Sequence, residues 1–223
     1  PCDLNNLFIT DPDPLRLVER AETDGFPKNL CNWIKGIYGV VVGQRVNTVV
    51  CVMDLDCSNT RALAEILTYT GVRVIPFSYP YDRDRAGFEH EIEKFSAAFG
   101  AGRGDIQEVE KALERVRRNL AEIDRLTWED NLVSGKENNT WLLSASDMEG
   151  DYRQYEARSW EFLSEAQKGE KKVGTRIGYV GVPPITTDLY DFLENLGCHV
   201  VYRSTLPVRL PFLLPYLDAL PAT

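Results

Sequence analysis

The sequence lacks long apolar runs, clusters of positive charge and a signal peptide. Its longest apolar stretches, such as TVVCVM and IYGVVVG, fall far short of the roughly 18 residues that a membrane-spanning helix needs. No run of five Lys or Arg residues occurs, and the formal net charge of the 223-residue chain is −9. These features exclude nucleic acid and membranes as partners. Because the N-terminal segment is also too acidic and polar for a signal peptide, we expect a cytoplasmic protein.

Cysteine is sparse and irregularly spaced. The five residues Cys2, Cys31, Cys51, Cys57 and Cys198 form no CxxC pair, so neither a secreted disulfide framework nor a zinc ribbon is predicted. We expect reduced thiols. Free cysteine commonly packs as a small hydrophobic side chain, and the apolar surroundings of Cys51 predict that role for it.

The common catalytic and nucleotide-binding motifs are also missing. Neither GxGxxG nor GxxxxGK[ST] stands in a strand-to-helix turn, and GAGRG at 100–104 reads as a linker between two helices. With only His90 and His199, the chain shows no HExxH site and no support for a His-based triad.

Two segments have the pattern of βαβ units. Residues 46–53 form a β-branched run typical of a strand buried on both faces, a helical pattern then runs to Gly71, and a second strand ends near Pro80. Residues 176–204 repeat this order of strand, helix and strand. We therefore predict an α/β fold, flavodoxin-like or Rossmann-like, with a parallel sheet covered by helices on both faces.

Helical segments are expected at the N-terminus and in the middle of the chain. Residues 151–168 have a helical pattern, and a longer amphipathic stripe precedes them. The stripe consists of Ile106, Val109, Leu113, Val116, Leu120 and Ile123.

Cys57 lies where α/β proteins place their chemistry, in the loop between a strand and the following helix. Ser58, Asn59 and Thr60, which follow it, are natural N-cap residues. A thiolate at this helix N-terminus would be stabilised and suited to metal ligation or nucleophilic attack, whereas a packed thiol beside a capping residue is the alternative. Cys31, in NLCNWIKG, taken alone favours a core thiol, yet two distant thiols can share one iron–sulfur cluster.

Six segments in the same order resemble a known family, the subunits of 2-hydroxyacyl-CoA dehydratases and benzoyl-CoA reductases of the 2-hydroxyglutaryl-CoA dehydratase D-component type. They cover most of residues 1–203. The segments are PCD, AETDGFPKNLCNWIKGIYG, LDCSNTRALAEIL, GVRVIPFSYPYDRD, LLSASDMEGDYRQYE and RIGYVGVPPITTDLYDFLENLG.

The resemblance implies two flavodoxin-like domains around a cysteine-bound iron–sulfur cluster, commonly 4Fe-4S, in an anaerobic lyase or reductase. An electron from a separate ATP-hydrolysing activator reaches an acyl-CoA and makes a ketyl radical. Cys31 and Cys57 match the first two cluster ligands of the family. Asn32, Ser58 and Asn59 beside them are candidates for hydrogen bonds to sulfur, although helix capping is the alternative, particularly for Asn59. The implied partner is a homologous second subunit or a second copy of the chain.

The chain also departs from the family pattern. Family subunits are longer, and their third cysteine ligand comes from a later domain. Cys198 lies near that region but does not match the ligand motif. We expect an α/β domain over residues 1–205 and, over 206–223, an apolar proline-rich tail that begins a missing or divergent second domain. The tail would cover a docking face or pack as a terminal helix.

Three functions therefore stay open from the sequence. The first is an iron–sulfur subunit acting on an acyl-CoA, and the second is a non-catalytic homologue or scaffold without a complete cluster. The third is a thiol-dependent enzyme that uses Cys57 as its nucleophile.

Overall fold

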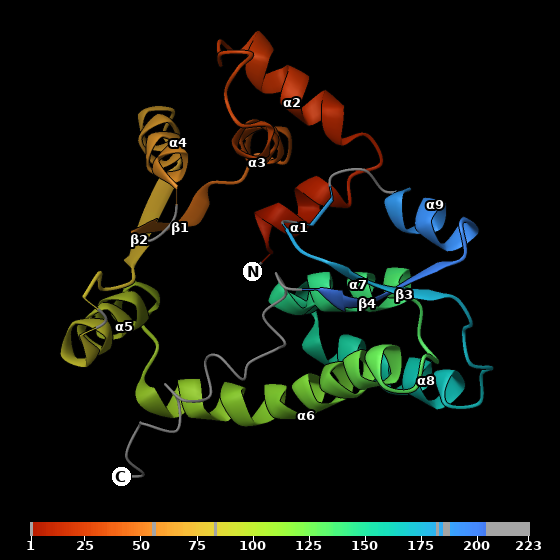
Figure 1. Ribbon diagram of the computed structural model, residues 1–223. Helices are drawn as coiled ribbons and strands as arrows, with labels where there is room; N and C mark the ends of the chain where they lie inside the picture. The colour runs from red at the N-terminus through yellow and green to blue at the C-terminus, as the bar shows by residue number, and fades with distance from the viewer. Residues whose placement is uncertain (1, 55–56, 83, 182, 185–187, 204–223) are drawn as a thin grey trace. The chain divides into compact units, whose positions relative to one another are not determined.

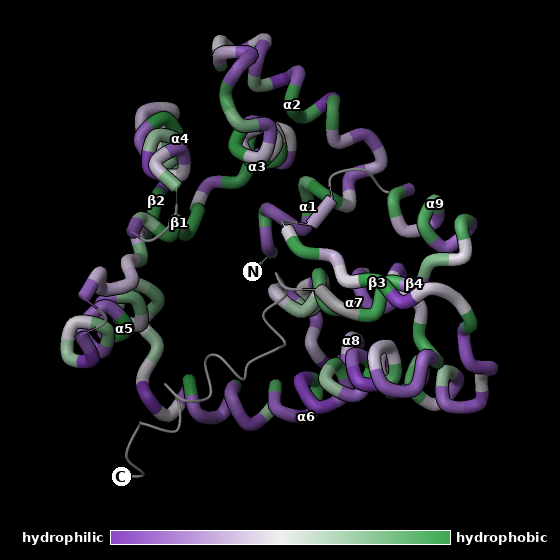
Figure 2. The backbone as a smooth tube through the Cα atoms, in the orientation of Figure 1, coloured by the Kyte–Doolittle hydropathy of each residue, from purple (hydrophilic) through white to green (hydrophobic). Residues whose placement is uncertain are grey.

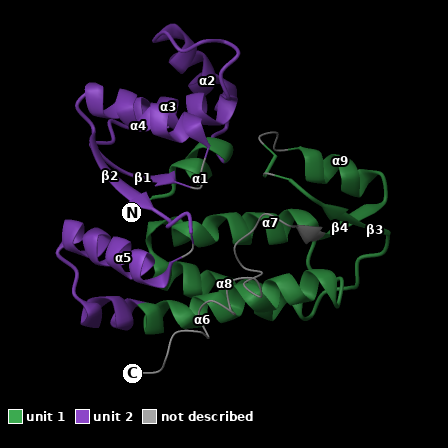
Figure 3. Ribbon diagram, turned by 60° about the vertical axis from the view of Figure 1, so that its left-hand side comes forward, with its two compact units in different colours: residues 1–9, 110–223 green, residues 10–109 purple. Residues whose placement is uncertain are grey.

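The computed structural model describes residues 2–54, 57–82, 84–181, 183–184 and 188–203 (Figure 1). The chain divides into two compact units, which are described separately. Unit 2 comprises residues 10–109, and unit 1 comprises residues 1–9 and 110–223 (Figure 3). The tail expected at 206–223 lies outside the described residues, so the predicted boundary at 205 stays a prediction.

Unit 2 contains the first predicted βαβ unit. Its strands β1 and β2 pair in parallel, with Val49 beside Val74, and α4 connects them. The predicted strands and helix are thereby confirmed. The elements are α2 (Pro14–Thr23), α3 (Asn32–Gly43), β1 (Thr48–Asp54), α4 (Ser58–Tyr69), β2 (Arg73–Ser78) and α5 (Arg85–Phe99).

Burial along β1 alternates, which differs from the prediction of a strand buried on both faces. Val49 and Cys51 are buried, whereas Val50 between them is 44% exposed. Cys51 is a core thiol, as predicted, and burial raises its pKa. One face of β1 packs on α4, whereas the face that carries Val50 is only partly covered by the described residues. In β2, the exposed Pro76 lies beside Cys51.

Helices α2 and α3 approach each other closely at Gly39. A Cβ at this position would lie 2.9 Å from the backbone carbonyl carbon of Leu17 in α2. Only glycine therefore permits this packing, because no side-chain rotation could relieve a backbone clash. Gly43, at the end of the same helix, has open space around it.

Unit 1 combines a helical core with the second predicted βαβ unit. Strands β3 and β4 pair in parallel and α9 connects them, as predicted. Helix α6 begins in unit 2 and continues into unit 1. The elements are α1 (Leu4–Ile9), α6 (Arg103–Trp128), α7 (Gly135–Leu143), two short 3₁₀ helices at Ser144–Ser146 and Met148–Gly150, α8 (Tyr152–Ala166), β3 (Thr175–Tyr179), α9 (Leu189–Asn195) and β4 (Cys198–Arg203).

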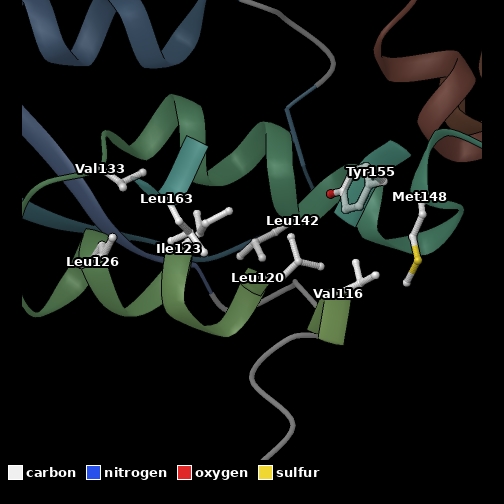
Figure 4. Close-up of a cluster of buried hydrophobic side chains, with 9 residues drawn as sticks. All are labelled: Val116, Leu120, Ile123, Leu126, Val133, Leu142, Met148, Tyr155 and Leu163. Atoms are coloured by element: carbon white, nitrogen blue, oxygen red, sulfur yellow. The ribbon is translucent and has the colours of Figure 1, made fainter. Parts of the chain in front are cut away.

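The core of unit 1 follows the stripe predicted for α6. Hydrophobic residues recur singly along this largely hydrophilic helix, and those from Val116 onward turn inward against α7 and α8 (Figures 2 and 4). Ile106 and Val109, at the start of the stripe, are exposed instead. The buried cluster consists of Val116, Leu120, Ile123, Leu126, Val133, Leu142, Met148, Tyr155 and Leu163.

The α/β class and the parallel strand pairing are confirmed. The described strands form two separate two-stranded sheets, and the flavodoxin-like arrangement stays a prediction. Within the described residues, no helix combines the length and apolar character that a membrane crossing requires.

Candidate functional site

Both predicted ligand cysteines stand at the N-terminal ends of helices in unit 2. Cys31 is the N-cap of α3 and Cys57 is the N-cap of α4, and both are exposed. Helices α3 and α4 contact each other and appear as neighbours in Figure 3. The structure thus brings the two cysteines onto the ends of neighbouring helices, and the alternative interpretation of either residue as a buried core thiol is wrong.

The backbone at each cysteine begins the helix and leaves the side chain outside it. The Cys31 carbonyl accepts a hydrogen bond from Lys35 N at 3.2 Å, and the Cys57 carbonyl accepts one from Thr60 N at 3.0 Å. Neither sulfur makes a side-chain capping bond to the backbone. A thiolate at either position therefore lies near the N–H groups of the first helical turn, which favour negative charge.

Thr60 provides one polar contact to a candidate ligand. The sulfur of Cys57 and the hydroxyl oxygen of Thr60 lie 3.7 Å apart, within the range of a hydrogen bond to sulfur. Hydrogen bonds to sulfur tune a thiolate and any metal that it binds. The sequence marked Thr60 only as a possible capping residue.

A buried lysine holds the segment in front of Cys31. Lys35 is 1% exposed, and its Nζ donates to Oε1 of Glu22 at 2.6 Å and to the backbone oxygen of Lys28 at 3.0 Å. These bonds fasten α2 and the connection 24–30 to the first turn of α3. The local signal was a single charged residue within the apolar run NWIKGIYGVVVG.

Tyr38 fastens the same connection one turn further along α3. Its hydroxyl donates to Oδ2 of Asp24 at 3.2 Å, and its ring centroid lies 4.6 Å from that of Phe26. Burial raises the pKa of Tyr38, and the hydrogen bond from Arg20 lowers the pKa of Asp24. Together with Lys35, these contacts fix the approach of the chain to Cys31.

An ion pair spans the loop that carries Cys57. Arg61 in α4 donates to Asp54 at the end of β1 at 2.8 Å. Both side chains are about half exposed, so the pair contributes little to stability. It nevertheless connects the end of the strand with the second turn of the helix that Cys57 caps.

The remaining predicted residues are placed less informatively. Asn32 and Ser58 are exposed beside the cysteines, and Asn59 is half-buried; their hydrogen bonds to sulfur stay predictions. Cys198 is half-buried in β4 of unit 1. Among the residues that the structure describes, no group of three or more His, Cys, Asp or Glu side chains could hold a metal ion.

The donor chemistry of unit 2 fits an iron–sulfur cluster in part. Cysteine thiolates are the usual ligands of such clusters, and a four-iron cluster generally uses four. Cys31 and Cys57 offer two exposed thiols, and no third ligand is assigned within the described ranges.

The chain matches a model of a known protein family. A model of the family described as 2-hydroxyglutaryl-CoA dehydratase, D-component, matches residues 13–213. No curated protein matches the chain. The matched range contains Cys31, Cys57 and both βαβ units.

Proposed function

The chain belongs to the 2-hydroxyglutaryl-CoA dehydratase D-component family, and from this premise we propose an iron–sulfur subunit that acts on an acyl-CoA. Cys31 and Cys57 would hold the cluster. The observation that supports this assignment is the exposure of both thiols at the N-terminal ends of two helices that pack against each other. When bound, the cluster would supply a low-potential electron to the substrate.

The protein's own residues would prepare this site. The N–H groups at the starts of α3 and α4 would favour the thiolate forms of both cysteines. The bonds of Lys35 to Glu22 and Lys28 would hold the backbone that presents Cys31. The hydroxyl of Thr60 would donate to the Cys57 sulfur and reduce its electron density.

The dehydration of a 2-hydroxyacyl-CoA is the reaction that the family description supports. Reduction of an aromatic acyl-CoA, as in benzoyl-CoA reductases, would use the same cluster. Two thiols cover only part of a four-iron cluster, so we also propose that a homologous second subunit or a second copy works with this chain. An ATP-hydrolysing activator would supply the electron.

Anaerobic reconstitution with iron and sulfide tests the ligand assignment. We expect the full chain to become brown with stoichiometric iron and sulfide. Cys31→Ser and Cys57→Ser should each lose most of the iron, because each removes a sulfur ligand. Cys2→Ser is the matched control, since Cys2 is also an exposed thiol. Full iron content in the Cys31→Ser and Cys57→Ser variants would refute the assignment.

The same samples separate the alternatives. A non-catalytic homologue is favoured by the absence of a three-ligand group among the described residues, and it predicts a colourless chain after reconstitution. A nucleophilic Cys57 predicts rapid, selective alkylation of that thiol in an iron-free protein. For the leading proposal, addition of a 2-hydroxyacyl-CoA should alter the electron paramagnetic resonance spectrum of the reduced cluster.

A further inference from the structure

Helices α6 and α8 of unit 1 line an open groove with a volume of about 630 Å³. The two helices lie side by side in Figures 1 and 3. Arg115, Arg118 and Asn119 line it from α6, and Arg153, Glu156 and Trp160 line it from α8. Arg118 and Asn119 each lie three or four residues after Arg115, and Arg153, Glu156 and Trp160 follow one another at the same spacing, so each helix turns these side chains toward one side. The volume lies within the range typical of small-molecule sites.

The groove gathers three arginine side chains although the chain is acidic. Among the lining side chains, three guanidinium groups accompany one carboxylate, and Glu114 and Asp151 lie near two of them. Arg115 is neutralised, because its Nε lies 2.9 Å from Oε1 of Glu156 and its Nη2 lies 3.3 Å from Oε2.

The other two arginines keep donors for a ligand. Arg118 lies 3.6 Å from Glu114 in a pair whose side chains are both well exposed, which is a weak interaction in water. Arg153 donates to the hydroxyl of Tyr152 at 3.1 Å, and the carboxylate of Asp151 lies near it, beyond salt-bridge distance among the described residues. Guanidinium groups bind phosphate through paired, charge-assisted hydrogen bonds.

The floor of the groove is fixed by hydrogen bonds between the helices. Nδ2 of Asn119 donates to Oγ of Ser159 at 2.9 Å and to the backbone oxygen of Glu156 at 3.4 Å. Ser159 is fully buried. The arginines therefore project from two helices that these hydrogen bonds join, which lowers the cost of ordering the groove when a ligand binds.

Trp160 adds a flat apolar surface beside these charges. Its side chain is 66% exposed, which is unusual for an indole that serves only as packing. An indole face stacks on purine and other aromatic rings. The combination of two available guanidinium groups and one exposed indole selects a ligand that carries both phosphate and an aromatic ring.

We propose that this groove binds a phosphorylated purine nucleotide, with Arg118 and Arg153 on its phosphates and Trp160 stacked on its base. This chemistry is shared by the nucleotide end of CoA and by free adenine nucleotides. Assignment of the ligand as CoA rests on the proposed function, whereas nucleotide binding in the groove requires no iron–sulfur cluster.

Titration calorimetry of the iron-free full chain at low salt tests the site. The probes are adenosine 3′,5′-bisphosphate, CoA, 3′-dephospho-CoA, ATP and ribose 5-phosphate. We expect R118Q and R153Q each to weaken the binding of adenosine 3′,5′-bisphosphate about tenfold, as for a lost charged hydrogen bond. W160A should weaken adenosine 3′,5′-bisphosphate about tenfold through lost stacking and leave ribose 5-phosphate unchanged.

Arg117→Gln is the matched control, because Arg117 is exposed on the same helix but does not line the groove. Absence of binding by all purine probes, or equal binding by wild type, R153Q and W160A, would overturn the proposal. Preference for CoA over 3′-dephospho-CoA and ATP identifies CoA as the source, and preference for ATP identifies a free nucleotide. Because no iron is present, these outcomes are independent of the cluster experiment.

Discussion

The two βαβ units have the same form but carry different residues where the helix begins. Each unit has two parallel strands connected by one helix. In each unit a glycine of positive φ comes directly after the helix, with φ of +90° at Gly71 and +73° at Gly197. In unit 2 the N-cap of the helix is the exposed thiol of Cys57, whereas in unit 1 it is Asp188. The same topology therefore places a different side chain at the helix N-terminus in each unit, a thiol in unit 2 and a carboxylate in unit 1.

The surroundings of the two units differ as well. In unit 1, α6 buries a nine-residue hydrophobic cluster against α7 and α8. In unit 2, the candidate ligands are exposed, and a buried lysine holds the connection before one of them. We infer that the main packing energy and the candidate chemistry belong to different sets of residues, which mutations can separate.

The largest expected effect is the loss of core packing in unit 1. Ile123 is fully buried, so Ile123→Ala should lower the free energy of unfolding by about 2–5 kcal/mol. Urea unfolding measures this change, with Arg117→Ala as a surface control expected to stay within about 0.5 kcal/mol. Under native conditions the alkylation rates of Cys31 and Cys57 should not change, because both thiols are already exposed. An increase in those rates would contradict the proposed separation.

A second test concerns the packing that supports Cys31. Gly39→Ala should lower the free energy of unfolding by about 1–3 kcal/mol, because its Cβ would meet the backbone of Leu17. Gly43→Ala in the same helix should instead be neutral or stabilising by up to about 1 kcal/mol, since open space surrounds that glycine. Thermal unfolding of the pair measures the difference. Equal effects would show that α2 and α3 do not depend on the close approach.

The third test removes the buried lysine. Lys35→Met deletes the bonds to Glu22 and to the Lys28 carbonyl and should cost about 1–3 kcal/mol. Lys28→Met is the control, because that side chain is exposed and only its backbone oxygen accepts the bond. If Lys35 also positions Cys31, its removal should change the alkylation rate of Cys31 more than that of Cys57. Equal changes at both thiols would show that Lys35 stabilises the fold and does not position Cys31.

The smallest expected effect is a pH dependence in unit 1. Burial, with help from Lys172 and Arg176, lowers the pKa of His199, and its Nε2 has no hydrogen-bond partner within the described residues. The unfolded imidazole then binds a proton at a higher pH than the folded one. Stability should be complete above about pH 6.5 and decrease as the pH falls below it.

Thermal unfolding between pH 8 and pH 5 measures this contribution of His199. His199→Gln should flatten the decrease, whereas His90→Gln, at an exposed position on α5, should retain it. An unchanged slope in His199→Gln would assign the pH dependence to other groups.

Local patterns in the sequence predicted the elements well. The β-branched run before Cys57, the helical spacing up to Gly71 and the stripe in the middle of the chain each produced the expected strand or helix. These signals depend on residues a few positions apart. The extent of the sheet depends on distant strands, and the exposure of Val50 shows that an apolar run alone did not predict which faces are covered.

The candidate site was predictable only in part. The resemblance selected Cys31 and Cys57, and the structure adds their exposure and their helix N-caps. The role of Lys35 required knowledge of which backbone oxygen it reaches, and the groove required the pairing of α6 with α8. Both depend on contacts between helices that no local spacing encodes.

Pro76 has a consequence for how the first sheet can grow. Proline lacks a backbone N–H and is confined largely to strands at the margin of a sheet. Its place in β2 therefore disfavours pairing of a further strand along β2, and we expect any additional strand to pair with β1. This one proline thus favours growth of the sheet at the edge formed by β1.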